Sequence, residues 1–186
     1  VAWRYDFGLP ARETDANGLA TNWTYDDFGR RTGRTAADGT RRSWSYQSCP
    51  AGNCWGAGEL RFAVVGRFYG ADGALVREQQ AYYDGYERVR RAEHHGALGA
   101  WVRRTYDYDV LGRPVRETRP YSTTANGHTQ RSFDLLGRLT SVRDYDAAGV
   151  LVGSSTLAYA GRSTTLTDVF GRAQVRFNDV TGKLRR

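Results

Sequence analysis

The sequence predicts an all-β fold made of antiparallel hairpins that repeat along one sheet. A short phrase, Tyr25-Asp26-Asp27-Phe28-Gly29-Arg30, returns along the chain with its Asp, Gly and Arg at fixed spacing. Twenty-two glycines against four prolines indicate many tight turns. Twelve Tyr, five Trp and seven Phe are typical of strands and are too many for a disordered chain.

Three further clear copies of the phrase begin at Tyr108, Phe133 and Thr167. Weaker copies, which have Glu for Gly, Lys for Arg, or the Gly one residue early, begin at Tyr83, Asn178 and Tyr5. We expect the residues of the clear copies to build structural turns: Tyr25, Asp26, Gly29 and Arg30; Tyr108, Asp109, Gly112 and Arg113; Asp134, Gly137 and Arg138; Asp168, Gly171 and Arg172.

The chemistry of the phrase explains why it makes a turn. An Asp side chain accepts hydrogen bonds from backbone amides two residues on, and a Gly three residues later adopts positive φ at no steric cost. Asp-x-x-Gly therefore predicts a type I turn with a bulge that joins two strands. The aromatic residue before the Asp suits the end of a strand, and the Arg after the Gly begins the return strand with its head in water or paired with an acid.

Residues 1–47 are expected to form three or four strands, of which 20–26, 30–35 and 40–47 are the clearest. Within the last of these, Arg42, Trp44 and Tyr46 share one face by period-two alternation. Further turns are predicted at 15–18 and 37–39.

Residues 48–58 are expected to be an inserted loop, because glycines and both cysteines interrupt the strand rhythm there. A disulfide between Cys49 and Cys54 could close this short loop and would fit an oxidising compartment. A metal site is the weaker interpretation, because two thiolates need two further ligands and none of the three histidines has a matching spacing. We therefore expect no metal and no cofactor.

The remainder is also predicted to be β-structure, with about fourteen strands in total and no convincing helix. Residues 87–95 are the best helix candidate, since they lack Gly and Pro, but they have no apolar helical face and are predicted as a strand. Turns are predicted at 71–73, at Asn126-Gly127 and at 146–149. The other expected strands are residues 59–69, 74–83, 100–109, 150–160, 162–168 and 172–179.

The formal charge of +7 does not single out an anionic partner. The 27 basic residues are spread along the chain, which is typical of a solvated or salt-bridged sheet face. Basic residues and stacking aromatics occur in single-strand binders, but here the aromatics lie mainly beside turns, so nucleic acid is not an expected partner. No run of eighteen apolar residues and no signal-peptide pattern is present, so no membrane segment is expected.

Tyr-Asp-x-x-Gly-Arg units interleaved with Asp-Gly turns resemble the YD repeats of the Rhs family, which is related to the Tc-toxin C components and the teneurins. The resemblance covers nearly the whole chain. It implies a long curved or spiralling β-sheet that is part of a hollow shell, and in bacterial members the shell encloses a C-terminal toxin domain. The Asp-Pro dipeptide found near the self-cleaving segment of bacterial members does not occur in this chain.

We expect residues 1–186 to be a single YD-repeat segment and a fragment of a much longer shell, since no methionine occurs and the first residues already resemble a strand. The implied function is structural: a shell segment that encapsulates or displays a toxin domain. Expected partners are the remainder of the same shell and the enclosed toxin domain, with secretion-system components and cell-surface glycans as further candidates. The expected location is secreted or at the cell surface, after bacterial export.

Two alternatives remain open at the level of sequence. One is an extracellular carbohydrate-binding or adhesive module that uses exposed aromatics such as Trp44 and Trp101. The other is a catalytic function. It is not the expected one, because the chain lacks nucleophile-elbow, phosphate-loop, zinc-protease and Cys–His motifs. The sharpest catalytic possibility is a glycosidase with two carboxylates, although the aspartates of the phrase already have a role in turns. Its candidates are Asp107, Asp109, Asp134, Asp144 and Asp146.

Overall fold

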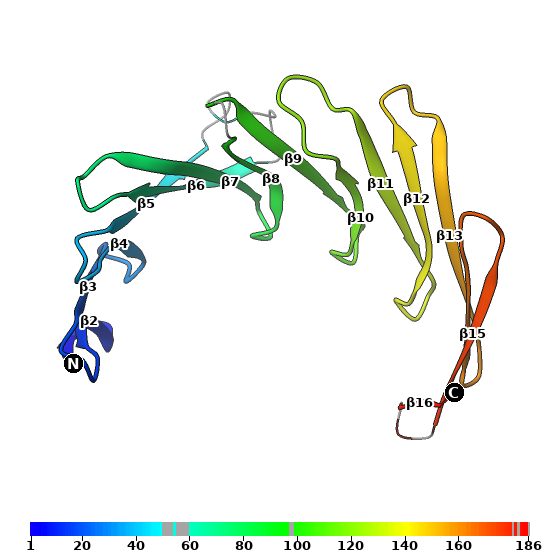
Figure 1. Cartoon of the computed structure of the whole chain (residues 1–186), viewed down its shortest axis with the longest axis horizontal. Helices are drawn as coiled ribbons and strands as arrows, with labels where there is room; N and C mark the ends of the chain where they lie inside the picture. Colours follow the sequence, from blue (N-terminus) through cyan, green and yellow to red (C-terminus); the bar gives the residue numbers. More distant parts are fainter. Residues whose placement is uncertain (50–53, 55–59, 97–98, 180, 182, 186) are drawn as a thin grey trace. The chain divides into compact units, whose positions relative to one another are not determined.

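The computed structural model describes residues 1–49, 54, 60–96, 99–179, 181 and 183–185 (Figure 1). Most of the predicted inserted loop at 48–58 therefore lies outside the described residues. The chain divides into two compact units, Val1–Arg103 and Arg104–Arg186. Each unit is described by itself.

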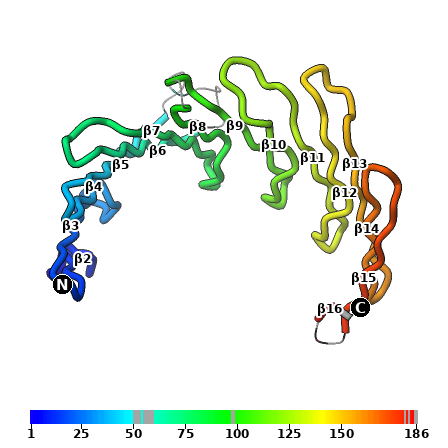
Figure 2. Tube along the Cα trace, viewed as in Figure 1, coloured from blue at the N-terminus to red at the C-terminus, as the bar shows by residue number. Residues whose placement is uncertain are grey.

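Unit 1 is a meander of antiparallel strands in which each strand pairs with the next along the chain. Figure 2 shows the trace running back and forth through these strands. The strands are β1 (Ala2–Arg4), β2 (Leu9–Thr14), β3 (Ala20–Tyr25), β4 (Arg31–Thr35), β5 (Arg41–Ser48), β6 (Leu60–Tyr69), β7 (Leu75–Asp84) and β8 (Val89–His95).

Unit 2 repeats the same architecture, again with antiparallel neighbours in chain order. Its first strand, β9, begins within the last residues of unit 1. The strands are β9 (Trp101–Tyr108), β10 (Pro114–Thr118), β11 (Gly127–Phe133), β12 (Leu139–Asp146), β13 (Leu151–Ala160), β14 (Ser163–Thr167), β15 (Ala173–Asn178) and β16 (Leu184–Arg185).

The predicted fold class, an all-β sheet of repeated antiparallel hairpins, is confirmed. Residues 89–95 form a strand, so the strand prediction for 87–95 is confirmed as well. The described residues form sixteen strands, more than the predicted fourteen; β1 and β16, with three and two residues, are too short to give a visible alternation. Among the described residues no helix has the length and apolar character needed to cross a membrane.

The predicted turn at Asn126-Gly127 is wrong. Gly127 is the first residue of β11 and is buried, and residues 119–126 connect it to β10. Its φ of 131° and a hydrogen bond of 3.0 Å from the Arg119 backbone N–H to its carbonyl fix this position. A Cβ atom here would collide with the carbonyl oxygen of Tyr145 on β12, which is why the chain needs Gly.

Neither unit has a deep core. The buried apolar residues among the described positions are Leu60, Ala63 and Val65, all on β6. Most other strand side chains are half-buried, as expected for sheet faces that pack along the sheet instead of against a second layer. Cohesion therefore depends on the backbone ladders and on contacts between side chains of neighbouring strands.

Candidate functional site

The best-defined candidate site is the repeated turn. Between β3 and β4, Oδ1 of Asp26 accepts hydrogen bonds from the backbone N–H groups of Phe28, at 3.0 Å, and Arg30, at 2.9 Å. The Gly29 N–H donates to the Asp26 carbonyl at 3.1 Å, and Gly29 has a φ of 76°. The residues thus form a type I turn followed by a bulge, the local structure that the phrase favours.

The same bonds recur at the other clear copies of the phrase. The Oδ1 atoms of Asp109, Asp134 and Asp168 accept backbone N–H groups two and four residues on, at 2.8 to 3.0 Å. The glycines that follow have φ angles of 77° to 79°. The weaker copy at Asp84 makes the same bonds although Glu87 occupies the Gly position with a φ of 59°, a region that non-glycine residues rarely adopt.

Each turn arginine binds the aspartate of its own turn. Nε of Arg30, Arg113, Arg138 and Arg172 donates to the second carboxylate oxygen at 2.6 to 2.7 Å. Burial alone would raise the pKa of Asp134, but the hydrogen bonds from the Arg138 backbone and side chain outweigh it and hold this pKa below its usual value. The guanidinium group of each turn arginine is therefore bound to the turn carboxylate and does not simply lie in water.

The turn arginine also reaches the strand after the return strand. The guanidinium carbon of Arg30 lies 4.3 Å from the ring centroid of Tyr46 on β5, and that of Arg138 lies 4.3 Å from the ring of Tyr159 on β13. Both tyrosine hydroxyls donate to a backbone carbonyl just past the turn, Tyr46 to Arg31 at 3.1 Å and Tyr159 to Leu139 at 2.8 Å. We call this set of Asp, Gly, Arg and ring the turn lock.

A third stack involves the aromatic residue that opens a copy of the phrase. Arg113, in the turn between β9 and β10, lies 4.7 Å from the ring of Phe133 on β11. Phe133 opens the next copy of the phrase, so the Arg of one copy holds the aromatic residue of the following copy. Tyr25 contacts a strand that precedes it in the chain, since its hydroxyl donates to the carbonyl of Pro10 on β2 at 2.8 Å. Tyr108 ends β9 opposite Pro114.

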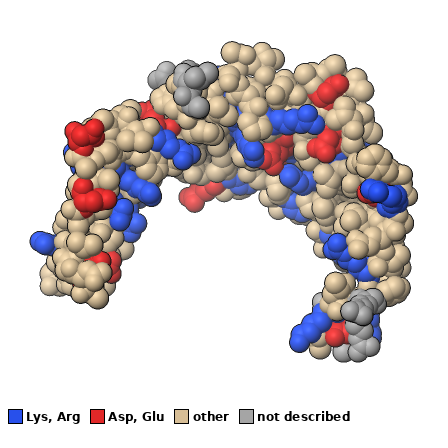
Figure 3. Space-filling view, in the orientation of Figure 1, with Lys and Arg blue, Asp and Glu red and all other residues tan. Residues whose placement is uncertain are grey.

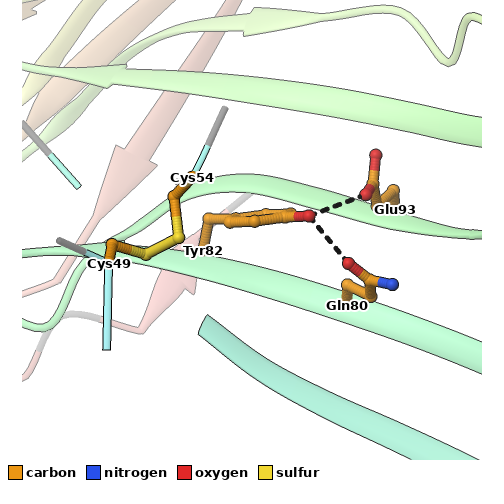
Figure 4. The surroundings of a disulfide bond; sticks show 5 residues. All are labelled: Cys49, Cys54, Gln80, Tyr82 and Glu93. Atoms are coloured by element: carbon orange, nitrogen blue, oxygen red, sulfur yellow. Dashed lines mark hydrogen bonds between the residues drawn. A yellow bond between two sulfur atoms is a disulfide. The ribbon is translucent and has the colours of Figure 1, made fainter. Parts of the chain in front are cut away.

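A second polar cluster, which the sequence did not indicate, lies on β7 and β8 near the cysteines (Figure 4). The Tyr82 hydroxyl is 2.7 Å from Gln80 Oε1 and 3.0 Å from Glu93 Oε1, both of them acceptors. Glu93 also accepts hydrogen bonds from buried Arg91 at 2.6 Å and from Arg103 at 3.1 Å. Burial and the negative charge of Glu93 raise the pKa of Tyr82 to about 12. The only signal in the sequence was the alternation that places Arg91 and Glu93 on one face of a strand.

The two cysteines are joined, with the Sγ atoms of Cys49 and Cys54 forming a disulfide (Figure 4). His94 and His95 are neighbours on β8 and so point to opposite faces of the sheet, and His95 packs against Trp101 with 4.1 Å between ring centroids. His128 stacks on Tyr145 at 4.7 Å. Within the described ranges no three side chains of His, Cys, Asp or Glu gather in a way that could hold a metal.

The structure does not bring the candidate glycosidase carboxylates together as hydrogen-bonded partners among the described residues. Asp109 and Asp134 are held in their turn locks, and Asp146 accepts the backbone N–H groups of its own turn. Asp107 pairs with Arg116 at 3.4 Å, and Asp144 accepts the Thr129 hydroxyl at 2.6 Å. Each carboxylate thus has a structural partner.

Fold and site together define a repeat protein in which consecutive hairpins are fastened to one another through their turns. Residues 4–41, which contain the first lock aspartate, glycine and arginine, match the family model described as RHS Repeat. The resemblance to the Rhs/YD-repeat family is therefore confirmed. The comparison with curated proteins finds no matching sequence.

Two solved structures have a similar fold. One is the crystal structure of TcdB2-TccC3, with a TM-score of 0.58 and 15% identity over 99% of this chain. The other is the crystal structure of TcdB2-TccC3-Cdc42, with a TM-score of 0.57 and 12% identity over 100% of this chain. The chain spans 14% and 16% of those two chains, respectively. At such identities the likeness is one of fold.

Proposed function

We propose that this chain is one segment of the wall of a longer Rhs-type shell, and that the wall encloses or displays an attached toxin domain. The role is mechanical and steric: the wall keeps the attached domain away from its target and from proteases until delivery. No catalytic step is assigned to this segment. The remainder of the shell and the attached domain are its partners, and export to the outside of a bacterial cell is its route.

The turn lock is the observation that carries this proposal. A protein whose task is to enclose needs a sheet that extends hairpin by hairpin without opening between them. Hydrogen bonds along the ladder supply part of that cohesion, and the stacks from Arg30 to Tyr46, Arg113 to Phe133 and Arg138 to Tyr159 join three of the turns to the strand after their return strand. The repeated residues of the turn lock are therefore expected to hold neighbouring strands together and not to bind a ligand.

The exposed turn tips support the view that the chain is part of a larger assembly. The two residues between Asp and Gly are apolar in three of the clear copies, and Val110, Leu135 and Leu136 have relative exposures of 100%, 104% and 77%. Leu111 and Phe170 are exposed as well. Apolar side chains at consecutive turns are expected to be covered by another part of an assembly.

The carbohydrate-binding alternative receives less support. Trp101 packs on His95, and the Trp44 side chain is only partly exposed. The rings of Tyr46, Phe133 and Tyr159 already hold arginines. These rings therefore present less of their surface to a sugar.

The test uses the longer polypeptide that carries this segment together with its attached domain. Limited proteolysis should cut the attached domain slowly when the wall is intact. Arg138→Gln combined with Arg113→Gln removes the arginines of two consecutive locks and should accelerate cutting of the attached domain. Arg176→Gln serves as the control and should leave the rate unchanged, because Arg176 lies at an exposed strand position and its side chain donates a long hydrogen bond of 3.3 Å to Gln174.

Equal cutting of the attached domain in the intact polypeptide and as an isolated domain would contradict enclosure. Equal protection in the lock variant and the parent, with the lock variant shown to be less stable, would contradict the role of the locks.

A further inference from the structure

A row of arginine and aromatic side chains crosses one face of unit 1. The strand register places five residues opposite one another from β3 to β7, and residues directly opposite in a sheet share a face. We call them the arginine row: Trp23, Arg34, Arg42, Phe68 and Arg77. Figure 3 shows basic and acidic side chains on the face of the molecule that is turned to the viewer.

Among the described residues of unit 1, some arginines are neutralised by a carboxylate, and two arginines of this row are not. On the opposite face, Arg67 pairs with Glu78 at 2.7 Å and Arg91 pairs with Glu93 at 2.6 Å. In the part of unit 1 that the structure describes, neither Arg42 nor Arg77 forms an ion pair.

Arg34 lies directly opposite Arg42, an arrangement of like charges that destabilises a sheet. It also interacts electrostatically with Asp38 of the following turn. We therefore rely on Arg42 and Arg77, which form no ion pair with the described residues of unit 1.

Aromatic rings fix where these guanidinium groups lie. The ring of Phe68 has Arg42 at 4.7 Å and Arg77 at 6.0 Å from its centroid, and the ring of Trp23 carries Arg31 at 5.6 Å. Rings used in this way are not free to stack on nucleotide bases or sugars. A stacked guanidinium still presents its N–H donors at the edge of its plane, where a carboxylate can bind through two hydrogen bonds.

A groove of about 360 Å³ adjoins the row on the same face. Arg77 forms one wall, and Trp44, Tyr83 and His94 form others. Glu93 also lines the groove, and its carboxylate accepts hydrogen bonds from Arg91 and Arg103. The floor has small side chains because Gly66, Ala81 and Ala92 lie there. A Cβ on Gly66 would lie 3.3 Å from Cγ of Gln79 and 3.7 Å from Cδ1 of Trp44, so the hollow between these two side chains depends on Gly.

The size and surroundings of the groove restrict what can bind. A volume at the low end for ligand sites suits a single apolar side chain and not a folded domain. The backbone groups of β5 to β8 are used in their own ladders, so an incoming chain cannot be held by strand addition along this face. Recognition must therefore come from side chains. Carboxylates of the partner would bind the arginines, and an apolar side chain of the partner would enter the groove.

We propose that this face of β5–β8 binds an extended acidic polypeptide segment, with carboxylates on Arg42 and Arg77 and a neighbouring apolar side chain in the groove. Alternate side chains of an extended segment lie about 7 Å apart on one side, a spacing that two arginines on β5 and β7, about 10 Å apart, can meet with their flexible stems. The proposal rests on the proposed function, since a wall that encloses a polypeptide must face one.

The test measures binding of labelled peptides to the full 186-residue chain by fluorescence anisotropy at low salt. The probe is a twelve-residue peptide of Glu and Asp with Leu at every third position, a length chosen to span about 40 Å when extended. A second peptide carries Gln and Asn in place of every acid. The acidic peptide should bind and the neutral one should not.

Arg42→Gln with Arg77→Gln should weaken binding of the acidic peptide about ten-fold or more, since both charge-assisted pairs with its carboxylates are lost. The control, Arg12→Gln with Arg176→Gln, removes the same charge at exposed positions and should change binding less than about three-fold. Ala92→Leu, which fills the groove, should weaken only the peptide that contains Leu and not an all-acidic peptide.

Equal weakening by the two double variants would show attraction by net charge alone and would overturn the proposal. So would an absence of binding to the folded chain, or displacement of the peptide by single-stranded oligothymidine through the same two arginines. Protection of the attached domain in the longer polypeptide with no peptide binding would refute this proposal alone. Peptide binding without such protection would refute the proposed function alone.

Discussion

Replacing Gly137 with Ala isolates the cost of the turn conformation. Gly137 has a φ of 79°, and the nearest atom to an added Cβ is Arg113 Nη1 at 3.8 Å, so the substitution meets open space and changes only the backbone preference. An L-residue in the left-handed region costs about 1 to 2 kcal/mol. We expect Gly137→Ala to lower the free energy of unfolding by that amount, a decrease of about 2 to 8 °C in Tm.

Gly153→Ala provides the matched control in unit 2. Gly153 lies in β13 at an ordinary φ, and its added Cβ would make a normal contact of 3.6 Å with Val169. The reduced freedom of the unfolded chain should make Gly153→Ala neutral or stabilising by up to about 1 kcal/mol. Urea unfolding followed by circular dichroism measures both variants. If the two substitutions shift the urea midpoint equally, the turn assignment is refuted.

Three further predictions concern titration and the disulfide. The pKa of Asp134 is lowered in the folded state, so its contribution to stability is present above the ordinary carboxylate range and is lost as pH falls through the folded pKa; the urea midpoint should drop at low pH, and less so in Asp134→Asn. The pKa of Tyr82 is raised to about 12, so the stability it contributes is present below pH 10 and is lost between pH 10 and about 12. Burial also raises the pKa of Tyr83, so absorbance at 295 nm should show late-titrating tyrosines, one fewer of them in Tyr82→Phe. Reduction of Cys49–Cys54 should cost about 2 kcal/mol or less, because the closed loop is short, and Cys49→Ser with Cys54→Ser should make urea unfolding insensitive to reductant.

The turns could be predicted from the sequence because their chemistry is local. The Asp26 carboxylate meets backbone N–H groups two and four residues away, and Gly29 provides the left-handed residue that the bulge needs. Nothing outside this short segment is required to form these contacts. Glu87 shows the limit of the rule, since the turn forms there without Gly at the cost of backbone strain.

The contact between the turn arginine and the ring, which is the part of the turn lock that lies outside the turn, could not be predicted. Tyr46 and Tyr159 lie outside any copy of the phrase, and their place over Arg30 and Arg138 depends on the register of two successive strand pairs. Register is set by the whole hairpin, and a slip of one residue would move each ring to the other face. The wrong turn at Asn126-Gly127 has a similar origin, because the close approach of Gly127 to Tyr145 is a contact between strands.

The buried cluster around Glu93 was missed for a different reason. Alternation places Arg91 and Glu93 on one face of β8, but it does not say that this face is the buried one. In a single-layer sheet both faces contain polar residues, so the usual rule of apolar inside and polar outside gives little guidance. Only the partners on neighbouring strands, Tyr82 and Arg103, show that the charge of Glu93 is satisfied.

The two faces of unit 1 use arginine in two ways, and this difference has a functional consequence. Glu78 binds Arg67 and Glu93 binds Arg91, so the charges of these arginines are compensated within the chain. Where Arg42 and Arg77 lie over Phe68, the ring orients the guanidinium groups and leaves their full charge. An ion pair and a ring contact can both hold an arginine in place, but only the ring leaves it able to bind a carboxylate from another chain. The face that carries the arginine row is therefore the one on which we propose that a partner polypeptide docks.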